Sequence, residues 1–258
     1  MTEPYIRLSR VGKSYQTADG PTLACEDIDL EIRRSEFVAI VGPSGCGKTT
    51  ILKMVAGLVP YSSGSITLGG ALVRKPQTDV GIVFQDAIML DWRDVLSNVM
   101  IQIDIRRMDR SRYEPVALEL LKATGLAGFE NRKPYELSGG MRQRVSICRA
   151  LVHDPPVLMM DEPFGALDAL TREQISMDIQ RLWMERRKTA LHITHSIPEA
   201  VLLADRVVVM SPRPGRIVEI IDIDLPRPRR LDRVPPEFHE YTGRIRDIFK
   251  SRGVLAMD

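Results

Sequence analysis

The stretch that decides the fold is Gly42-Pro43-Ser44-Gly45-Cys46-Gly47-Lys48-Thr49. A glycine followed by four residues and then Gly-Lys-Thr is the spacing of a phosphate-binding loop, whose glycines allow several backbone N–H groups to turn toward one anion. Lys48 adds a positive charge for the β- and γ-phosphates, and the Thr49 hydroxyl can ligate Mg²⁺. We expect all eight residues and the adjacent Thr50 to bind nucleotide, with ATP and Mg²⁺ as the cofactors.

The segments on either side of the loop supply the context that this motif requires. Residues 37–41 form a continuous apolar run, the pattern of a strand buried on both faces, and residues 50–56 read as a helix. Short alternating segments at 5–8 and 28–32 predict half-buried strands that pair antiparallel.

Buried strands and helices alternate along the rest of the chain. The apolar runs at 157–160 and 207–210 and the segment 189–194 predict strands, and a helix is expected over roughly 169–187. The expected fold is therefore α/β: a P-loop NTPase with a parallel core sheet, an antiparallel β subdomain and an inserted α-helical subdomain at about 94–150.

The expected domain organisation is one ATPase domain over residues 1–210, followed by a C-terminal extension over 211–258. The extension opens on the turn 211–215 and continues into a proline- and arginine-rich segment, and residues 237–250 are expected to form a short helix.

Composition narrows the function classes. The formal net charge of +2 is too small for a nucleic-acid-binding protein. The first residues show no secretory signal, and no run of about 18 apolar residues predicts a membrane span, so any membrane role is expected to come through a partner. Cys25, Cys46 and Cys148 show neither zinc-binding nor disulfide spacing, which fits a reducing compartment.

Two adjacent carboxylates follow the apolar run 157–160. In a nucleotide site, Asp161 would hold Mg²⁺ and Glu162 would face the attacking water as base, because neighbouring side chains at a strand end point in different directions. The ordinary alternative is a solvated acidic turn before Pro163, and the presence of the phosphate loop favours the catalytic role.

Three further residues carry weaker signals. Gln85 follows a predicted strand, so its amide could reach Mg²⁺ or the water, and His195 follows another, where an imidazole could contact the γ-phosphate. Tyr15 could stack on the base. A lone Gln or His at a strand end is more often an ordinary surface residue.

A second anion-binding surface is predicted where Leu137-Ser138-Gly139-Gly140-Met141-Arg142-Gln143-Arg144 begins a helix. Ser138 is a good N-cap, and Gly139 and Gly140 expose backbone N–H groups at the positive end of the helix. The ordinary alternative is a serine-capped helix with a flexible start. Since one nucleotide seldom needs two helix N-termini of one fold, the motif hints at the nucleotide of a second copy.

Taken in order, these motifs, together with Ala166-Leu167-Asp168, resemble the ABC-transporter ATPase family over about residues 5–210. The resemblance implies a head-to-tail dimer in which ATP lies between the phosphate loop of one copy and the Ser-Gly-Gly motif of the other. It implies that Ser138, Gly139 and Gly140 bind the γ-phosphate in trans and that Asp168 communicates across the interface. Gln85 would link the site to the helical subdomain, which docks on the membrane partner.

Two positions depart from the family pattern. Met141 stands where Gln is common, and little loss is expected because the backbone donors precede it. Ser196 follows His195 where Asp is frequent.

A finer resemblance points to the ATPases of nitrate/sulfonate/taurine-type importers, through residues 83–87, 90–93, 98–99 and 211–217. It implies uptake of a small anionic or sulfur- or nitrogen-containing solute, an integral membrane permease, a periplasmic solute-binding protein and a peripheral location on the cytoplasmic face of the inner membrane. The same residues could instead shape a coupling surface common to several importer subfamilies.

Three other classes of ATPase or GTPase fit the sequence less well. A detached exporter ATPase is disfavoured because residues 90–93 and 211–217 resemble segments of importer ATPases. A DNA-repair or chromosome-organising ATPase would need a long coiled coil between Thr49 and Ser138, where no sustained heptad run fits. A GTPase switch would need an Asn-Lys-x-Asp segment, and Asn131-Arg132-Lys133-Pro134 is not one.

Overall fold

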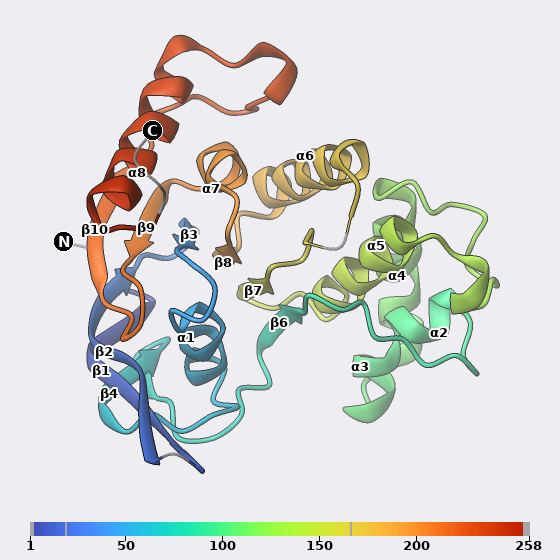
Figure 1. Ribbon diagram of the computed structural model, residues 1–258. Helices are drawn as coiled ribbons and strands as arrows, with labels where there is room; N and C mark the ends of the chain where they lie inside the picture. The colour runs from blue at the N-terminus through green and yellow to red at the C-terminus, as the bar shows by residue number, and fades with distance from the viewer. Residues whose placement is uncertain (1–2, 19, 166, 255–258) are drawn as a thin grey trace. The chain divides into compact units, whose positions relative to one another are not determined.

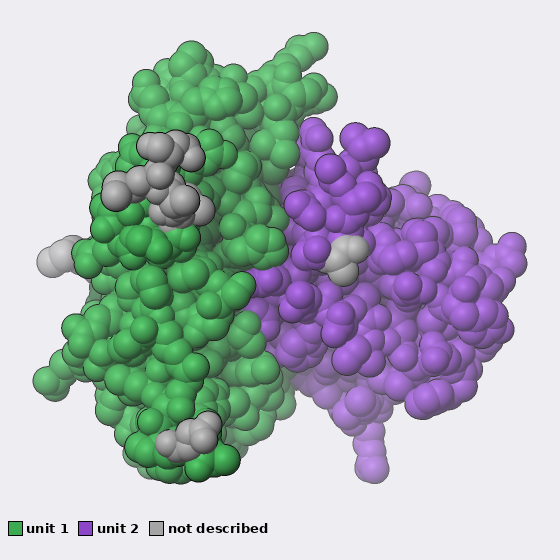
Figure 2. All heavy atoms as spheres, viewed as in Figure 1, with its two compact units in different colours: residues 1–78, 187–258 green, residues 79–186 purple. Residues whose placement is uncertain are grey.

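The computed structural model describes residues 3–18, 20–165 and 167–254. The chain divides into two compact units, which are coloured separately in Figure 2: unit 1 comprises Met1–Thr78 and Arg187–Asp258, and unit 2 comprises Asp79–Arg186.

Unit 1 contains an antiparallel sheet in the order β2-β1-β4-β5. Its strands are β1 (Ile6–Thr17), β2 (Gly20–Ile32), β4 (Ser63–Leu68) and β5 (Ala71–Leu72). Alternate residues such as Ile6 and Leu8 are buried while Arg7 is exposed, as a sheet with one covered face requires. The antiparallel strands expected near residues 5–8 and 28–32 are confirmed, because Ile6 pairs with Ile32 and Leu8 with Leu30.

Unit 1 also contains parallel strands, which form its buried core. β3 (Phe37–Val41) pairs in parallel with both β8 (Thr189–Thr194) and β9 (Arg206–Met210). All five residues of β3 are buried, as the continuous apolar run predicted. Helices α1 (Lys48–Val55) and α7 (Ile197–Leu203) pack against these strands (Figure 1).

The C-terminal region is integrated into unit 1. β10 (Ile217–Asp222) pairs antiparallel with β9, which the sequence analysis did not anticipate. A single 3₁₀ turn, Leu231–Arg233, precedes α8 (Pro236–Ser251), which confirms the helix expected at 237–250. The buried side chains of α8 include Phe238, Ile245 and Phe249, and the helix packs against α7.

Unit 2 combines two parallel strands with a set of helices. β6 (Val80–Val83) pairs in parallel with β7 (Val157–Asp161). The helical character expected near 94–150 is confirmed by five elements: α2 (Val95–Val99), α3 (Ile101–Ile105), α4 (Arg110–Ala123), the 3₁₀ turn Pro134–Glu136 and α5 (Gly139–Leu151). The helix expected at about 169–187 is α6 (Ala169–Arg186). Among the described residues, no helix combines the length and apolarity needed to cross a bilayer.

Candidate nucleotide-binding site

The phosphate loop joins β3 to α1 in unit 1. Gly45 (φ 77°) and Gly47 (φ 98°) adopt left-handed backbone conformations that a residue with a Cβ rarely takes. Gly47 caps α1, and its carbonyl accepts the first helical hydrogen bond from Ile51 at 2.9 Å. The loop therefore leads directly into the positive end of a helix, as an anion cradle requires.

The backbone of Ala24 and of Gly215 approaches the loop closely. A Cβ at Gly47 would lie 3.0 Å from the Ala24 carbonyl oxygen, and a Cβ at Gly215 would lie 1.9 Å from the Cys46 carbonyl oxygen. Gly215 is fixed by two backbone hydrogen bonds, to the Ala24 carbonyl at 3.0 Å and from the Glu26 N–H at 3.1 Å. This contribution of Gly215 was not predicted from the sequence, although segment 211–217 resembles the corresponding segment of importer ATPases.

Lys48 lies over the loop. Its side chain is buried, and its ammonium group donates to the carbonyl oxygens of Gly42 at 2.8 Å and Pro43 at 3.1 Å. A buried cation beside a glycine-rich loop that leads into a helix N-terminus fits an oxyanion such as a nucleotide phosphate.

Tyr15 and Thr50 meet beside the loop. The Tyr15 hydroxyl lies 3.4 Å from Thr50 Oγ1, and the Lys13 ammonium lies 4.9 Å from the centroid of the Tyr15 ring. Tyr15 is partly exposed, and Thr49 and Thr50 are half-buried. The structure thus places the tyrosine next to the loop, where stacking on a nucleotide base requires it.

His195 reaches the same sheet edge as the loop. In the parallel register of β3 and β8, Val41 lies opposite Thr194, so Gly42 and His195 follow at corresponding positions. The His195 side chain is exposed. Ser196 caps α7 by accepting a hydrogen bond from the Glu199 N–H at 3.4 Å, and because Ser and Asp are both good N-caps, the departure at this position keeps the local structure.

In unit 2, Gln85, Asp161 and Glu162 lie at the ends of paired parallel strands. Asp161 is the last residue of β7, and because Val83 lies opposite Met160, Gln85 and Glu162 each follow two residues beyond the last pair of β6 and β7. Asp161 is buried, Glu162 is half-buried and Gln85 is exposed.

Glu162 has φ 45°, a left-handed conformation that is uncommon outside glycine and clusters at functional sites. Gln143 of α5, which the sequence analysis did not single out, donates to the Phe84 carbonyl at 3.3 Å and so ties α5 to the end of β6. Its only sequence signal was its place in the Ser-Gly-Gly segment.

The Ser-Gly-Gly motif and Asp168 lie at the N-termini of two neighbouring helices of unit 2. Ser138 caps α5 by accepting a hydrogen bond from the Met141 N–H at 3.3 Å, which involves only the backbone of Met141. Ser138 and Gly139 are exposed, whereas Gly140 is buried and a Cβ there would lie 2.4 Å from Thr171 Cγ2. The Thr171 N–H donates to Asp168 at 3.0 Å and lowers the pKa of that carboxyl group. Ala166, part of the same predicted motif, lies outside the described residues.

The predicted residues therefore fall into three local groups. Unit 1 brings the loop together with Tyr15 and His195. Unit 2 places Gln85, Asp161 and Glu162 at the ends of two paired strands, and separately places Ser138–Gly140 and Asp168 at the N-termini of two neighbouring helices. Within the described parts of the chain, no cluster of three or more His, Cys, Asp or Glu side chains is arranged to hold a metal ion unaided.

Comparisons with known proteins identify the family. The sequence profile described as ABC transporter matches residues 25–165. The chain belongs to the ABC transporter family.

Several relatives cover nearly the whole chain. An uncharacterised ABC transporter ATP-binding protein of Methanocaldococcus jannaschii is 43% identical, and the match covers 95% of this chain and 91% of that protein. A taurine import ATP-binding protein of Rhizobium johnstonii is 45% identical over 88% of this chain and 89% of its own length. A bicarbonate transport ATP-binding protein of Synechocystis sp. is 40% identical over 97% and 91%.

Solved structures agree. The dimeric structure of a bacterial ABC transporter cassette has a TM-score of 0.75 and 31% identity, covering 85% of this chain and 99% of that one. A post-hydrolysis state of the same cassette, bound to ADP and Pi, also has a TM-score of 0.75, at 30% identity. The chain is thus an ATP-binding ABC ATPase with the P-loop NTPase fold expected from its sequence.

Proposed function

We propose that the chain is the ATP-hydrolysing motor subunit of an ABC importer that takes up a small anionic or sulfur- or nitrogen-containing solute through a separate membrane permease. The names of the taurine and bicarbonate relatives support import of such solutes. The observation that carries the proposal is the exposed, serine-capped N-terminus of α5 in unit 2, a phosphate-binding surface additional to the loop of unit 1.

The proposed chemistry divides among the three groups. The loop N–H groups and Lys48 hold the β- and γ-phosphates, and Tyr15 stacks on the base. Glu162 accepts a proton from the attacking water, and His195 contacts the γ-phosphate.

Magnesium fits the remaining oxygen donors. Mg²⁺ prefers oxygen ligands and in nucleotide sites is held by one or two carboxylates together with substrate phosphates. Thr49, Asp161 and Gln85 supply a hydroxyl, a carboxylate and an amide oxygen, so we propose them as its protein ligands. The ion would neutralise charge that develops on the phosphates.

A second copy of the chain completes the site in this proposal. Ser138, Gly139 and Gly140 of one copy bind the γ-phosphate held by the loop of the other, and Asp168 transmits the state of the interface. The dimeric cassette among the similar structures supports this arrangement.

The membrane partner is proposed to dock on the helical part of unit 2. Large apolar side chains are exposed there, with 70% of Ile88, 74% of Trp92 and 73% of Tyr135 accessible. The backbone beneath them is fixed: Arg149 donates to the Ile88 carbonyl at 2.7 Å and Lys133 to the Trp92 carbonyl at 3.1 Å. Exposed apolar patches on fixed backbone are typical of interaction sites. The ATPase would then lie peripherally on the cytoplasmic face of the membrane, and a periplasmic solute-binding protein would deliver the solute to the permease from the opposite face.

The catalytic assignment is tested by Glu162→Gln. The amide keeps the size of the side chain but cannot accept the proton, so ATP binding should persist, turnover should stop, and an ATP-bound dimer should accumulate in size-exclusion chromatography. Undiminished single-turnover hydrolysis by Glu162→Gln would contradict the assignment of Glu162 as the base.

The trans site is tested by Ser138→Arg, which places a bulky side chain on the exposed α5 surface. We expect ATPase activity to be lost while monomers still bind a fluorescent ATP analogue. Ser251→Arg, at the exposed end of α8, is the matched control and should keep activity. If monomer binding were lost with Ser138→Arg, the trans arrangement would be contradicted.

Import itself is tested by expressing the chain together with a candidate permease and solute-binding protein and measuring solute uptake into cells. Uptake that depends on Glu162 supports the proposal, whereas ATP-dependent efflux of the solute would overturn it.

A further inference from the structure

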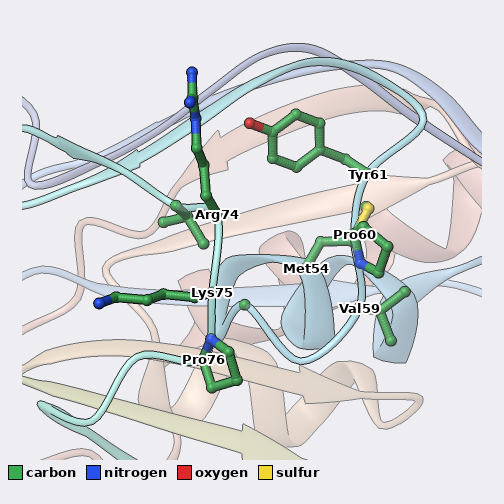
Figure 3. A pocket seen from close by; sticks show the side chains of 9 residues that line it. Met54, Val59, Pro60, Tyr61, Arg74, Lys75 and Pro76 are labelled. Atoms are coloured by element: carbon green, nitrogen blue, oxygen red, sulfur yellow. The ribbon is translucent and has the colours of Figure 1, made fainter.

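A cavity of about 430 Å³ lies in unit 1 between the C-terminal end of α1 and the segment that follows β5 (Figure 3). This volume is in the range of small-molecule sites. The lining residues are Met54, Gly57, Val59, Pro60, Tyr61, Val73, Arg74, Lys75 and Pro76. None of them belongs to the nucleotide site predicted from the sequence.

The walls of the cavity are fixed by backbone contacts. The Gln77 N–H donates to the Ala56 carbonyl at 3.0 Å, which fastens the 73–77 segment to the end of α1. Gly57 has φ 72°, and a Cβ there would lie 2.0 Å from the Lys75 carbonyl oxygen, so only glycine lets the two walls approach this closely. The cavity is therefore preformed, which lowers the entropic cost of binding a ligand.

The floor of the cavity is apolar and its rim is cationic. Met54 and Val73 are buried, whereas Arg74 and Lys75 are exposed. The nine lining residues include no carboxylate. An anion entering this cavity would meet positive charge without competition from a carboxylate in the lining.

The polar groups at the rim are available to a ligand. Within the described parts of the chain, the Arg74 guanidinium and the Tyr61 hydroxyl make no hydrogen bond or ion pair. Figure 3 shows the Tyr61 hydroxyl directed toward the Arg74 side chain across the gap between the two walls, while Lys75 extends away from Tyr61. A guanidinium and a hydroxyl that face one gap can donate together to one oxyanion.

From these observations we propose that the cavity binds a small organic anion, whose carboxylate, sulfonate or phosphate group lies between Arg74 and Tyr61 and whose apolar body packs on Met54 and Val73. Neither inorganic anions nor neutral apolar molecules satisfy both parts of the cavity. The site is separate from the ATP site but lies at the opposite end of α1, the helix whose N-terminus follows the phosphate loop.

The proposal is tested on the full chain with benzenesulfonate as probe, sulfate as the head group alone and benzyl alcohol as the apolar body alone. The methionine methyl groups are labelled with ¹³C and observed by NMR, and Met54 is assigned through Met54→Leu. We expect benzenesulfonate to shift the Met54 signal saturably, and the two partial probes to bind at least about tenfold more weakly.

Three variants locate the binding. Arg74→Gln should weaken benzenesulfonate binding about tenfold or more, because it removes a charge-assisted hydrogen bond. Tyr61→Phe should weaken it less, and Arg233→Gln, which removes an exposed cation elsewhere in unit 1, should leave it unchanged.

A competition experiment with ATP tests whether the cavity is distinct from the ATP site. In the presence of saturating ATP, the Met54 shift should persist. Displacement of benzenesulfonate by ATP, equal binding by Arg74→Gln, or no saturable shift of Met54 would each overturn the proposal. A Met54 shift produced only by the membrane permease would also overturn it, since it would assign the cavity to that partner.

Discussion

Gly215→Ala should disable the phosphate loop although residue 215 lies far from it in sequence. The added Cβ would lie 1.9 Å from the Cys46 carbonyl oxygen and 2.7 Å from Met210 Cε. The methionine methyl group ends a flexible side chain and can move. The Cys46 carbonyl belongs to the backbone of the loop and moves only if the loop moves.

The size of the displacement sets the expected loss. A real Cβ essentially never approaches another heavy atom closer than 3.0 Å, so the loop or residue 215 must shift by at least the difference from 1.9 Å, which is 1.1 Å. Misplacement of a catalytic group by about 1 Å can cost about 100-fold in rate, so we expect ATPase activity to fall by about that factor. Overpacking of this kind should also cost about 1–3 kcal/mol of the free energy of unfolding.

The assay compares Gly215→Ala with Gly243→Ala in steady-state ATPase rate, fluorescent nucleotide affinity and urea unfolding. A Cβ at Gly243 meets no atom within 4 Å, and the residue lies inside α8, so this control should keep activity and gain about 0.5–1 kcal/mol in stability. If Gly215→Ala hydrolysed ATP at the wild-type rate, the argument that residue 215 sets the position of the loop would be refuted.

Further predictions concern packing and burial. Arg229 is buried and donates to the Val201 and Ala204 carbonyls at 2.8 and 2.6 Å, so Arg229→Met should lower the free energy of unfolding by about 3 kcal/mol in urea titrations, and an unchanged midpoint would contradict this. Burial raises the pKa of the Cys148 thiol from 9.0 to about 12. The thiol of the unfolded chain ionises first as pH rises, so the contribution of Cys148 to the free energy of unfolding is fully present below pH 9 and is lost between pH 9 and about 12. In unfolding measured from about pH 8 to about pH 11, Cys148→Ala should therefore reduce the loss of stability with rising pH. Gly140→Ala should cost about 1–3 kcal/mol through its clash with Thr171, and Thr171→Ser, which removes the clashing methyl group, should restore most of it in a double-mutant cycle.

Local sequence patterns were sufficient for the elements that hold the site. The apolar run 37–41 predicted β3 because a strand buried on both faces has no polar alternation. The alternation of apolar and polar residues at 28–32 predicted a half-buried strand, because successive side chains of a strand point to opposite faces of the sheet. The glycine spacing of the loop predicted left-handed backbone, which Gly45 and Gly47 adopt.

The remaining features depend on contacts that no local pattern encodes. β10 is held by pairing with β9, and its sequence lacks the continuous apolar run of the core strands. Gly215 is required by an approach to Cys46, a residue distant in sequence. The left-handed backbone conformation of Glu162 could not be predicted from the local sequence either, because contacts with the surrounding structure hold a glutamate at φ 45°.

In the proposal, the two units carry groups with different tasks. The loop and Lys48 of unit 1 hold the phosphates, whereas Glu162 of unit 2 acts on the attacking water and the exposed α5 surface binds the γ-phosphate held by the second copy. Within unit 2, a Cβ at Gly140 would lie 2.4 Å from Thr171 Cγ2, and the Thr171 N–H donates to Asp168, so Thr171 connects the start of α5 with Asp168. In the proposal, changes at Lys48 should therefore appear first in nucleotide affinity, and changes at Glu162 or Ser138 first in turnover at unchanged nucleotide affinity of the monomer.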